Sequence, residues 1–363
     1  MKNILIAVSG TGGHVYPGIA LAYELKNEGY NPVFVVNNNK NGVSLNIVKN
    51  SGYDYTILDF KAPPRKISFD MILFPFKFIK VLFNANSILK EIKPKVVIGM
   101  GAYLSFPILL VARIKNISTL IHEQNSVPGL ANKILSLFVN KVAISFKETG
   151  KYFNKRKTVF TSNPIRKDIF NIKREDAAKK MNIASNVFTI FVFGGSLGAT
   201  KLNNIMFDVS KILYEKYKEK IQIIHILGKN DFQTLSKKYE TIEYNKYVVE
   251  YMNDIGNAYA CSDILICRAG AGTVKEVEMY NLPALFIPFP YATANHQYFN
   301  AKSVEQKNLR EVIEEKNITK EQIINFIENK MTDKIDTDRI IIPKSFPQEL
   351  LAKEVLKLIS EKI

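Results

Sequence analysis

The sequence predicts an α/β protein made of two doubly wound, Rossmann-like domains. Short runs rich in Val, Ile and Phe alternate with longer segments of helical periodicity, which is typical of βαβ units around a parallel sheet. A strand followed by a glycine turn and a helix occurs twice, at Asn3–Val8 and at Phe188–Phe193. The 363 residues also match the length of about two domains.

Each domain is expected to contribute its own series of buried strands. The first series is predicted at Asn3–Val8, Pro32–Val36, Lys95–Met100, Thr119–Glu123 and Lys141–Ser145, with a helix at Pro17–Asn27. The second series is predicted at Phe188–Phe193, Gln222–Leu227, Asp263–Cys267 and Ala284–Pro288.

Three segments follow from this pattern. Residues 1–162 form the first domain and residues 163–342 the second, since Asn163-Pro164 interrupts the pattern between them. Residues 343–363 form the third segment, in which Pro343 and Pro347 break the chain before an amphipathic helix from about Gln348 to Ser360. We hypothesise that this helix packs back on the first domain.

Composition and charge exclude or disfavour several classes of protein. Hydrophobic residues make up 47% of the chain and charged residues 23%, which excludes a disordered or fibrous protein, and two cysteines exclude a disulfide framework. Of the net charge of +16, +13 lies in residues 1–162, so the first domain is expected to face something anionic. A nucleic-acid-binding protein is disfavoured, because the basic excess lies beside a long apolar run rather than among aromatics along a groove.

That apolar run, residues 65–95, has two interpretations. It forms either a buried crossover helix or an interfacial patch whose apolar side chains enter lipid while lysines meet anionic headgroups, and one helix can do both. The membrane-facing candidates are Lys66, Phe74, Lys77, Phe78, Lys80 and Phe83. The longest nearly apolar stretch, Ala102–Ala112, is shorter than the ~20 residues of a membrane-spanning helix, so a soluble cytoplasmic chain is expected.

The two glycine turns are candidate phosphate sites, since a helix that begins after such a turn presents backbone amides and a favourable dipole. Neither turn fits the nicotinamide fingerprint or a P-loop. His14 follows the first turn and is either a packing residue or a general base. His122 lies at the carboxyl end of a predicted strand, whereas His225 is expected in the core. The histidines lack metal-ligand spacing, and Asp336-Thr337-Asp338 is a weak metal candidate.

A third strand-turn-helix follows Cys267. Small residues at 269–272 would let amides reach a diphosphate, with the helix beginning near Thr273. Glu276 would accept hydrogen bonds from ribose hydroxyls or complete a capping box with Thr273. Asn295-His296-Gln297, after a proline-rich loop, offers amides that suit sugar hydroxyls.

Five of these motifs occur in one order: residues 10–18, 122–125, 163–166, 194–199 and 295–297. Together they resemble the bacterial peptidoglycan enzymes that add N-acetylglucosamine to lipid I (undecaprenyl-pyrophosphoryl-N-acetylmuramoyl-pentapeptide) to make lipid II. The resemblance implies a GT-B architecture, with UDP-N-acetylglucosamine in the C-terminal domain and the acceptor in the N-terminal, membrane-binding domain across a cleft. It implies inverting transfer to the acceptor C4 hydroxyl by a peripheral protein on the cytoplasmic face of the inner membrane.

The resemblance also implies residue roles. Ser196 and Arg166 would meet the donor diphosphate with amides of Ala271, Gly272 and Thr273, and Glu276 would hold the ribose. Met252 would contact the uracil, Asn125 and Gln297 the acetamido sugar, and Thr11, Gly12 and Gly13 would line the cleft. His14 is the candidate base, no cofactor or tightly bound metal is implied, and a divalent cation would only stimulate. Ser9 and the loop 269–272 depart from the family pattern.

Related activities stay open at the level of sequence. A diacylglycerol glycosyltransferase and a UDP-N-acetylglucosamine 2-epimerase have the same expected fold, and the choice of acceptor would separate them. A nucleic-acid-binding protein is the alternative from another class, and arbitrary DNA would then bind with a steep salt dependence.

Overall fold

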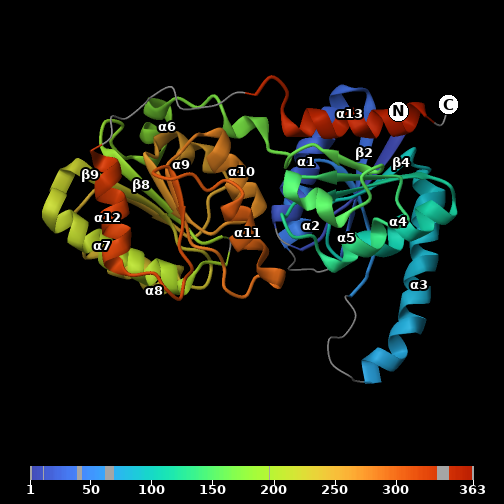
Figure 1. Cartoon of the computed structure of the whole chain (residues 1–363), viewed down its shortest axis with the longest axis horizontal. Helices are drawn as coiled ribbons and strands as arrows, with labels where there is room; N and C mark the ends of the chain where they lie inside the picture. Colours follow the sequence, from blue (N-terminus) through green and yellow to red (C-terminus); the bar gives the residue numbers. More distant parts are fainter. Residues whose placement is uncertain are drawn as a thin grey trace. The chain divides into compact units, whose positions relative to one another are not determined.

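The computed structural model describes residues 2–10, 12–38, 43–61, 69–195, 197–332 and 343–361. The chain divides into two compact units, which are taken here one at a time (Figure 1). Unit 1 comprises Met1–Arg166 together with Pro343–Ile363, and unit 2 comprises Lys167–Ile342. Unit 2 thus begins four residues after the boundary expected from the sequence. Ile165 stays with unit 1, where its side chain is buried and its amide donates to Gln348 Oε1 at 3.2 Å.

Unit 1 is built on a parallel sheet of seven strands in the order β3-β2-β1-β4-β5-β6-β7. The strands are β1 (Lys2–Ala7), β2 (Tyr30–Val36), β3 (Asp54–Ile57), β4 (Val96–Gly99), β5 (Ser118–Glu123), β6 (Lys141–Ile144) and β7 (Thr158–Phe160). The strand order reverses direction between β1 and β4. In doubly wound sheets the ligand binds at this switch point, beyond the carboxyl ends of the strands.

Helices cover both faces of this sheet. One face carries α1 (Gly12–Asn27), α2 (Val43–Asn50) and α13 (Pro347–Ser360), whose apolar residues share one core cluster. The other face carries α3 (Phe69–Ile92), α4 (Ser105–Ile114) and α5 (Leu130–Leu135). A 3₁₀ turn, η1 (Lys147–Tyr152), precedes β7. Helix α1 begins at Gly12, five residues before the predicted start at Pro17, so His14 lies in its first turn.

Helix α13 belongs to unit 1, although it lies far along the chain from the rest of it. It packs against α1, as Figure 1 shows, and buries Leu351, Val355 and Leu358 in the α1 side of the core. The Ser118 hydroxyl on β5 donates to the Leu358 carbonyl at 3.2 Å. Helix α13 therefore completes the cover that α1 and α2 give to this face of the sheet.

Helix α3 has an inner face and an outer face. Val81, Ala85 and Leu89 are buried in the core beneath α4, whereas the N-terminal turns extend away from the body of unit 1 (Figure 1). Contrary to the sequence expectation, the described residues do contain one segment, Met71–Ile92, that is long and apolar enough to cross a membrane. Core helices also meet that criterion, and the buried C-terminal half of α3 has this role.

Unit 2 repeats the design with a parallel sheet in the order β10-β9-β8-β11-β12-β13. Its strands are β8 (Phe188–Phe193), β9 (Ile221–Ile226), β10 (Lys246–Val249), β11 (Ile264–Cys267), β12 (Ala284–Phe286) and β13 (Arg310–Val312). Its helices are α6 (Arg174–Met181), α7 (Thr200–Tyr217), α8 (Phe232–Glu240), α9 (Ile255–Cys261), α10 (Ala271–Met279), α11 (His296–Lys302) and α12 (Lys320–Met331), with 3₁₀ turns η2 (Lys167–Ile169), η3 (Lys218–Lys220) and η4 (Thr293–Asn295). The switch point lies between β8 and β11.

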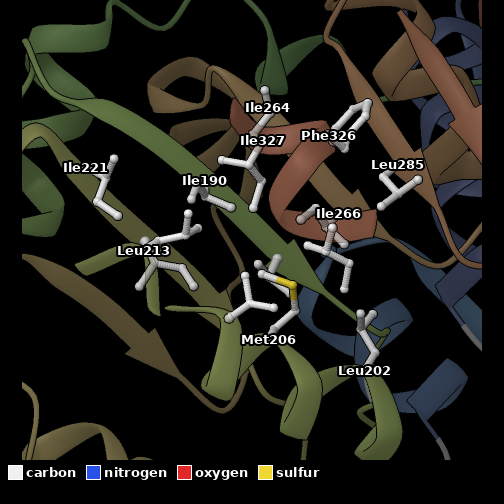
Figure 2. Packing of buried hydrophobic residues seen from close by; sticks show 14 of the residues in the cluster. Ile190, Leu202, Met206, Leu213, Ile221, Ile264, Ile266, Leu285, Phe326 and Ile327 are labelled. Atoms are coloured by element: carbon white, nitrogen blue, oxygen red, sulfur yellow. The ribbon is translucent and has the colours of Figure 1, made fainter. Parts of the chain in front are cut away.

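One core cluster of unit 2 lies between its sheet, α7 and α12. Figure 2 shows Met206 and Leu213 of α7 and Ile327 of α12 meeting side chains of the strands, such as Ile190 and Ile266. Each of these five side chains is at most 2% exposed. This packing fixes α7, and with it the glycine turn that precedes it.

Candidate functional site

The first glycine turn lies at the carboxyl end of β1, beside the switch point of unit 1. Gly10 has φ +87°, a left-handed conformation that suits glycine, and α1 begins directly after the turn. The first amides of a helix have no partner within it, so Gly12 and Gly13 present N–H groups at this edge. Thr11 and Ser196 lie outside the described residues.

His14 lies between this turn and the loop after β4. Gly101, with φ +81°, leaves space for the imidazole: a Cβ on it would lie 2.8 Å from His14 Cδ2 and 2.9 Å from Gln124 Oε1. The half-buried ring of His14 is therefore held against two loops from neighbouring strands. A base at this position would stand at the edge of the sheet where ligands of this fold bind.

The 122–125 motif is mainly a structural support. The imidazole of His122 is fully buried, and its Nε2 lies 3.1 Å from the Ser162 carbonyl. Burial lowers the pKa of His122 to about 4. The hydrogen bond to Ser162 opposes this shift, and the nearby His14 adds to it. Burial raises the pKa of the Glu123 carboxyl, although hydrogen bonds oppose the shift.

Glu123 holds the loop that carries Asn125. Its carboxylate accepts from the Asn125 amide at 2.9 Å and from Asn132 Nδ2 at 2.8 Å. Asn125 itself is half-buried, with its side-chain Nδ2 3.4 Å from the same carboxylate. Gln124 is buried and donates to the Met100 carbonyl at 2.8 Å, which ties this loop to the one containing Gly101.

Arg166 also lies in unit 1. Its guanidinium stands 4.7 Å from the centre of the Tyr16 ring, a cation–π contact with the first helix. This stacking orients the guanidinium near the N-terminal end of α1. Planar, bidentate donors of this kind suit a phosphate ligand.

The second glycine turn, after β8, is needed for close backbone packing. Gly195 and Gly198 have φ +98° and +90°, and the Gly198 amide donates to the Gly195 carbonyl at 3.0 Å. A Cβ on Gly228 would lie 2.1 Å from the Gly198 nitrogen, so two loops touch backbone to backbone. The N-terminus of α7 follows directly and is a suitable anion site.

Behind this turn lies a buried polar network. Asp231 accepts from Thr200 Oγ1 at 2.7 Å and from Asn203 Nδ2 at 2.8 Å. His225 bonds Asn203 Oδ1 and the Tyr239 hydroxyl through its two ring nitrogens, which confirms its predicted place in the core. Burial lowers the pKa of His225 to about 3, so the ring is neutral.

Helix α10 provides a second helix N-terminus at the same edge of the sheet. It begins at Ala271, not near Thr273, and no side chain caps Gly270. The predicted capping box of Thr273 and Glu276 is therefore wrong, because Glu276 lies in the second turn. Ala271, Gly272 and Thr273 are the first three helical residues, whose amides have no partner within the helix.

Glu276 has a partner that the sequence did not indicate. The buried hydroxyl of Tyr259, on α9, donates to Glu276 Oε2 at 2.7 Å. The two residues are seventeen positions apart on different helices, so local periodicity carries no signal for the contact.

Gln297 and Met252 complete the unit 2 candidates. Gln297 Oε1 accepts from the amides of Ala269 at 3.2 Å and Phe289 at 3.0 Å, so its oxygen joins the loops after β11 and β12. Met252 is half-buried in the loop after β10. Together with Glu276 and the α10 amides, these residues lie in loops or helix turns that follow the carboxyl ends of parallel strands.

The described residues contain no group of three or more His, Cys, Asp or Glu side chains that could hold a metal ion. The weak candidate at residues 336–338 lies outside them, as does Lys66.

Comparisons with known proteins cover both units. The N-terminal domain of glycosyltransferase family 28 matches residues 4–144, and the C-terminal domain of that family matches residues 189–353. A UDP-N-acetylglucosamine--N-acetylmuramyl-(pentapeptide) pyrophosphoryl-undecaprenol N-acetylglucosamine transferase of Thermoanaerobacter sp. (strain X514) is 40% identical over 325 residues, 88% of each chain. The protein of that name from Alkaliphilus metalliredigens (strain QYMF) is 34% identical over 98% of this chain and 99% of its own.

Solved structures with a similar fold also match nearly the whole chain. The crystal structure of Acinetobacter baumannii MurG matches with a TM-score of 0.69 and 27% identity, over 99% of this chain and 95% of that one. A UDP co-structure of S. aureus MnaA matches with a TM-score of 0.68 at 14% identity, over 99% and 98% of the two chains, which shows the fold alone. The predicted two-domain α/β GT-B architecture is confirmed, and the chain belongs to glycosyltransferase family 28.

Proposed function

We propose that this enzyme transfers N-acetylglucosamine from UDP-N-acetylglucosamine to the C4 hydroxyl of the N-acetylmuramoyl unit of lipid I, forming lipid II. The observation that carries the proposal is the likeness, at 34–40% identity over about nine-tenths or more of each chain, to transferases named for this reaction. Both glycine turns and the α10 N-terminus fit the anionic donor that those names specify.

Unit 2 supplies the features that suit a uridine diphosphate. The N-termini of α7 and α10 both follow neighbouring strands, β8 and β11, at the switch point. Their dipoles and backbone amides would stabilise the charge that develops on the departing diphosphate. Glu276 is assigned to the ribose and Met252 to the uracil, and Ser196 and Arg166 are assigned to the diphosphate.

His14 is assigned as the base that removes the proton of the acceptor hydroxyl. The oxygen then attacks the anomeric carbon on the face opposite the departing UDP, so the α linkage of the donor becomes a β linkage. Asn125 and Gln297 are assigned to the acetamido sugar. Since Gln297 Oε1 is already engaged with two amides, its part in that contact falls to its side-chain Nε2.

A membrane-facing surface on unit 1 is part of the proposal. Exposed apolar side chains occur on α3, on α4, which packs against α3, and around α5, which packs against α4. They are Ile72, Phe76, Ile79 and Phe83 of α3, Ile114 of α4, and Leu130, Ile134, Leu137 and Phe138 in and after α5. Lys77 and Lys80 are exposed on α3, and the basic excess of residues 1–162 has the sign that anionic lipid attracts.

Two of the residues predicted to face the membrane do not belong to this exposed surface. Phe74 and Phe78 turn inward, where their rings stack with centroids 5.9 Å apart and pack against Phe60. Phe83 is 68% exposed and stays a candidate. The resulting proposal is peripheral attachment to the cytoplasmic face of the bacterial inner membrane, where lipid I would be met.

The transfer assay tests the activity. Radiolabel from UDP-N-acetylglucosamine is supplied with a short-chain lipid I analogue, and diacylglycerol is the parallel acceptor. Label in a disaccharide-pentapeptide lipid alone is expected. Label on diacylglycerol, or rearrangement of the donor without transfer, would replace the proposal by a sibling transferase or an epimerase. The same assay after EDTA treatment tests the expectation that no tightly bound metal is required.

A further inference from the structure

The hydroxyl of Tyr259 stands out because it is buried and bonded to a proposed binding residue. Tyr259 is 1% exposed, and its hydroxyl donates to Glu276 Oε2 at 2.7 Å. A hydrogen bond to a carboxylate is short and strong, since the acceptor carries a charge. The bond joins α9 to α10, the helices that precede and follow β11.

The Tyr259 ring itself is fixed by aromatic neighbours. It stacks on Tyr280 with centroids 5.0 Å apart and an interplanar angle of 21°. Phe191 and Phe193 of β8 meet it edge-on, at 5.5 and 6.4 Å. A ring enclosed in this way keeps one rotamer, so its hydroxyl is a stationary donor. Burial also raises the pKa of Tyr259 well above its ordinary value, so the hydroxyl keeps its proton.

The bond limits how the Glu276 carboxylate can turn. A carboxylate has about four lone-pair positions, and the bond from Tyr259 takes up one of them. A ribose presents two neighbouring hydroxyls, and accepting from both requires a carboxylate in one orientation. A freely rotating carboxylate would lose side-chain entropy on binding that a held one does not lose.

We infer that Tyr259 is a positioning residue that makes the nucleotide site selective for ribonucleotides, by holding Glu276 in the orientation that accepts from the ribose hydroxyls. The inference rests on the proposed function, because it takes Glu276 as the ribose partner. It extends that function by assigning ribose discrimination to a pair of residues rather than to one carboxylate.

Nucleotide binding without acceptor tests the inference directly. The affinities of UDP, 2′-deoxy-UDP and 3′-deoxy-UDP are measured by calorimetry for the wild type and for Tyr259→Phe. Wild type is expected to prefer UDP over both deoxy analogues. Tyr259→Phe is expected to bind UDP about five- to tenfold more weakly while its affinity for the analogues changes little, so the preference shrinks.

Two further variants make the result specific. Tyr280→Phe removes another buried hydroxyl from the same aromatic stack, one that donates to the Ile169 carbonyl and not to Glu276. It controls for loss of a buried hydroxyl and is expected to keep the preference for UDP. Glu276→Asp keeps the charge but withdraws the carboxylate from Tyr259, and it should reduce the preference even if Tyr259→Phe folds poorly.

Coupling and kinetics complete the test. In Glu276→Ala, adding Tyr259→Phe is expected to cause no further loss of UDP affinity, since the two act through one contact. With turnover, Tyr259→Phe should raise the donor KM and leave kcat nearly unchanged. An unchanged UDP preference in Tyr259→Phe, or in Glu276→Ala, would overturn the inference. A wild type that binds no UDP at all would instead refute the proposed function.

Discussion

The position of His14 depends on a glycine that is remote from it in sequence. Gly101 combines a left-handed φ of +81° with contact to the imidazole, so two separate constraints act on one residue. Neither constraint is visible in the sequence, because the 100–103 loop lacks a recognisable phosphate-binding pattern. Gly101 is therefore a position that only the structure connects with His14.

Gly101→Ala is expected to reduce kcat at least tenfold, with a loss of stability of about 1 kcal/mol from the left-handed backbone. The added methyl would displace the His14 ring, against which it would lie 2.8 Å away. Gly29→Ala is the matched control, since Gly29 has the same left-handed φ of +81° and a Cβ there meets nothing within 4 Å. Steady-state rates and thermal unfolding of both variants check this; equal kcat in the two would contradict it.

His14→Ala is expected to lose most turnover, by roughly 10²- to 10⁴-fold, and to keep its affinity for UDP. The physical reason is that the assigned proton transfer is removed while the α7 and α10 amides of unit 2 are untouched. Single-turnover rates and UDP titration measure the two effects separately. A kcat within twofold of wild type would show that another group is the base.

At the scale of elements, α3 carries two apolar faces with different roles. Phe74 and Phe78 both pack against Phe60, and Phe78 also packs against Phe106. Phe76 and Phe83 are instead about 70% exposed. Composition alone could not separate these faces, because both are rich in Phe and Ile. Only the neighbours of the helix decide which face is core.

Two pairs of substitutions distinguish the faces. Phe76→Ser with Phe83→Ser should weaken binding to anionic vesicles and leave the melting temperature nearly unchanged, because exposed apolar surface is lost. Phe74→Ser with Phe78→Ser should instead lower the melting temperature, since cavities and unpaired hydroxyls enter the core. Vesicle flotation and calorimetry measure both. Equal vesicle binding by wild type and the outer pair would refute the membrane surface.

The strands that the sequence did not reveal share one property. β3, β7, β10 and β13 are the four edge strands of the two sheets, and they are short and only partly buried. Central parallel strands are covered on both faces and read as apolar runs, so they were found within one or two residues. Edge strands need no such run, because one side meets solvent.

For the molecule as a whole, two neutral buried histidines predict a loss of stability in acid. The pKa of His122 is lowered to about 4 and that of His225 to about 3, in both cases first by burial. In the unfolded chain both titrate near 6.5, so below that pH the unfolded state takes up protons that the folded state refuses. Stability falls from pH 6.5 downwards, by roughly 1 kcal/mol per histidine and pH unit.

Urea unfolding at pH 7.5 and pH 5.5 measures this effect. His122→Gln and His225→Gln should each flatten the dependence of the unfolding free energy on pH. The Glu123 carboxyl has the opposite effect on stability. Burial raises its pKa, so its contribution to the free energy of unfolding grows as the pH falls. A variant with the same pH dependence as wild type would exclude its histidine as a cause.

The two-domain plan was accessible from sequence because each half repeats a strand, a glycine turn and a helix. The exact boundary between the domains was harder to predict. Thr161, Ser162 and Asn163 are buried in unit 1, whereas Asn163-Pro164 has the sequence of an exposed loop. Contacts such as Tyr259 with Glu276 join distant positions, so they required the fold. The family resemblance named Glu276, and the fold supplied its partner.

The return of α13 to unit 1 has a consequence for the order in which the protein matures on the ribosome. Unit 2 is one continuous stretch of chain, whereas the α1 face of unit 1 lacks the part of its cover that α13 supplies until residues 347–360 emerge. Unit 2 can therefore complete its fold during synthesis while the earlier-made unit 1 still exposes apolar surface. A premature stop codon before Pro347 would spare the unit made later and damage the unit made first.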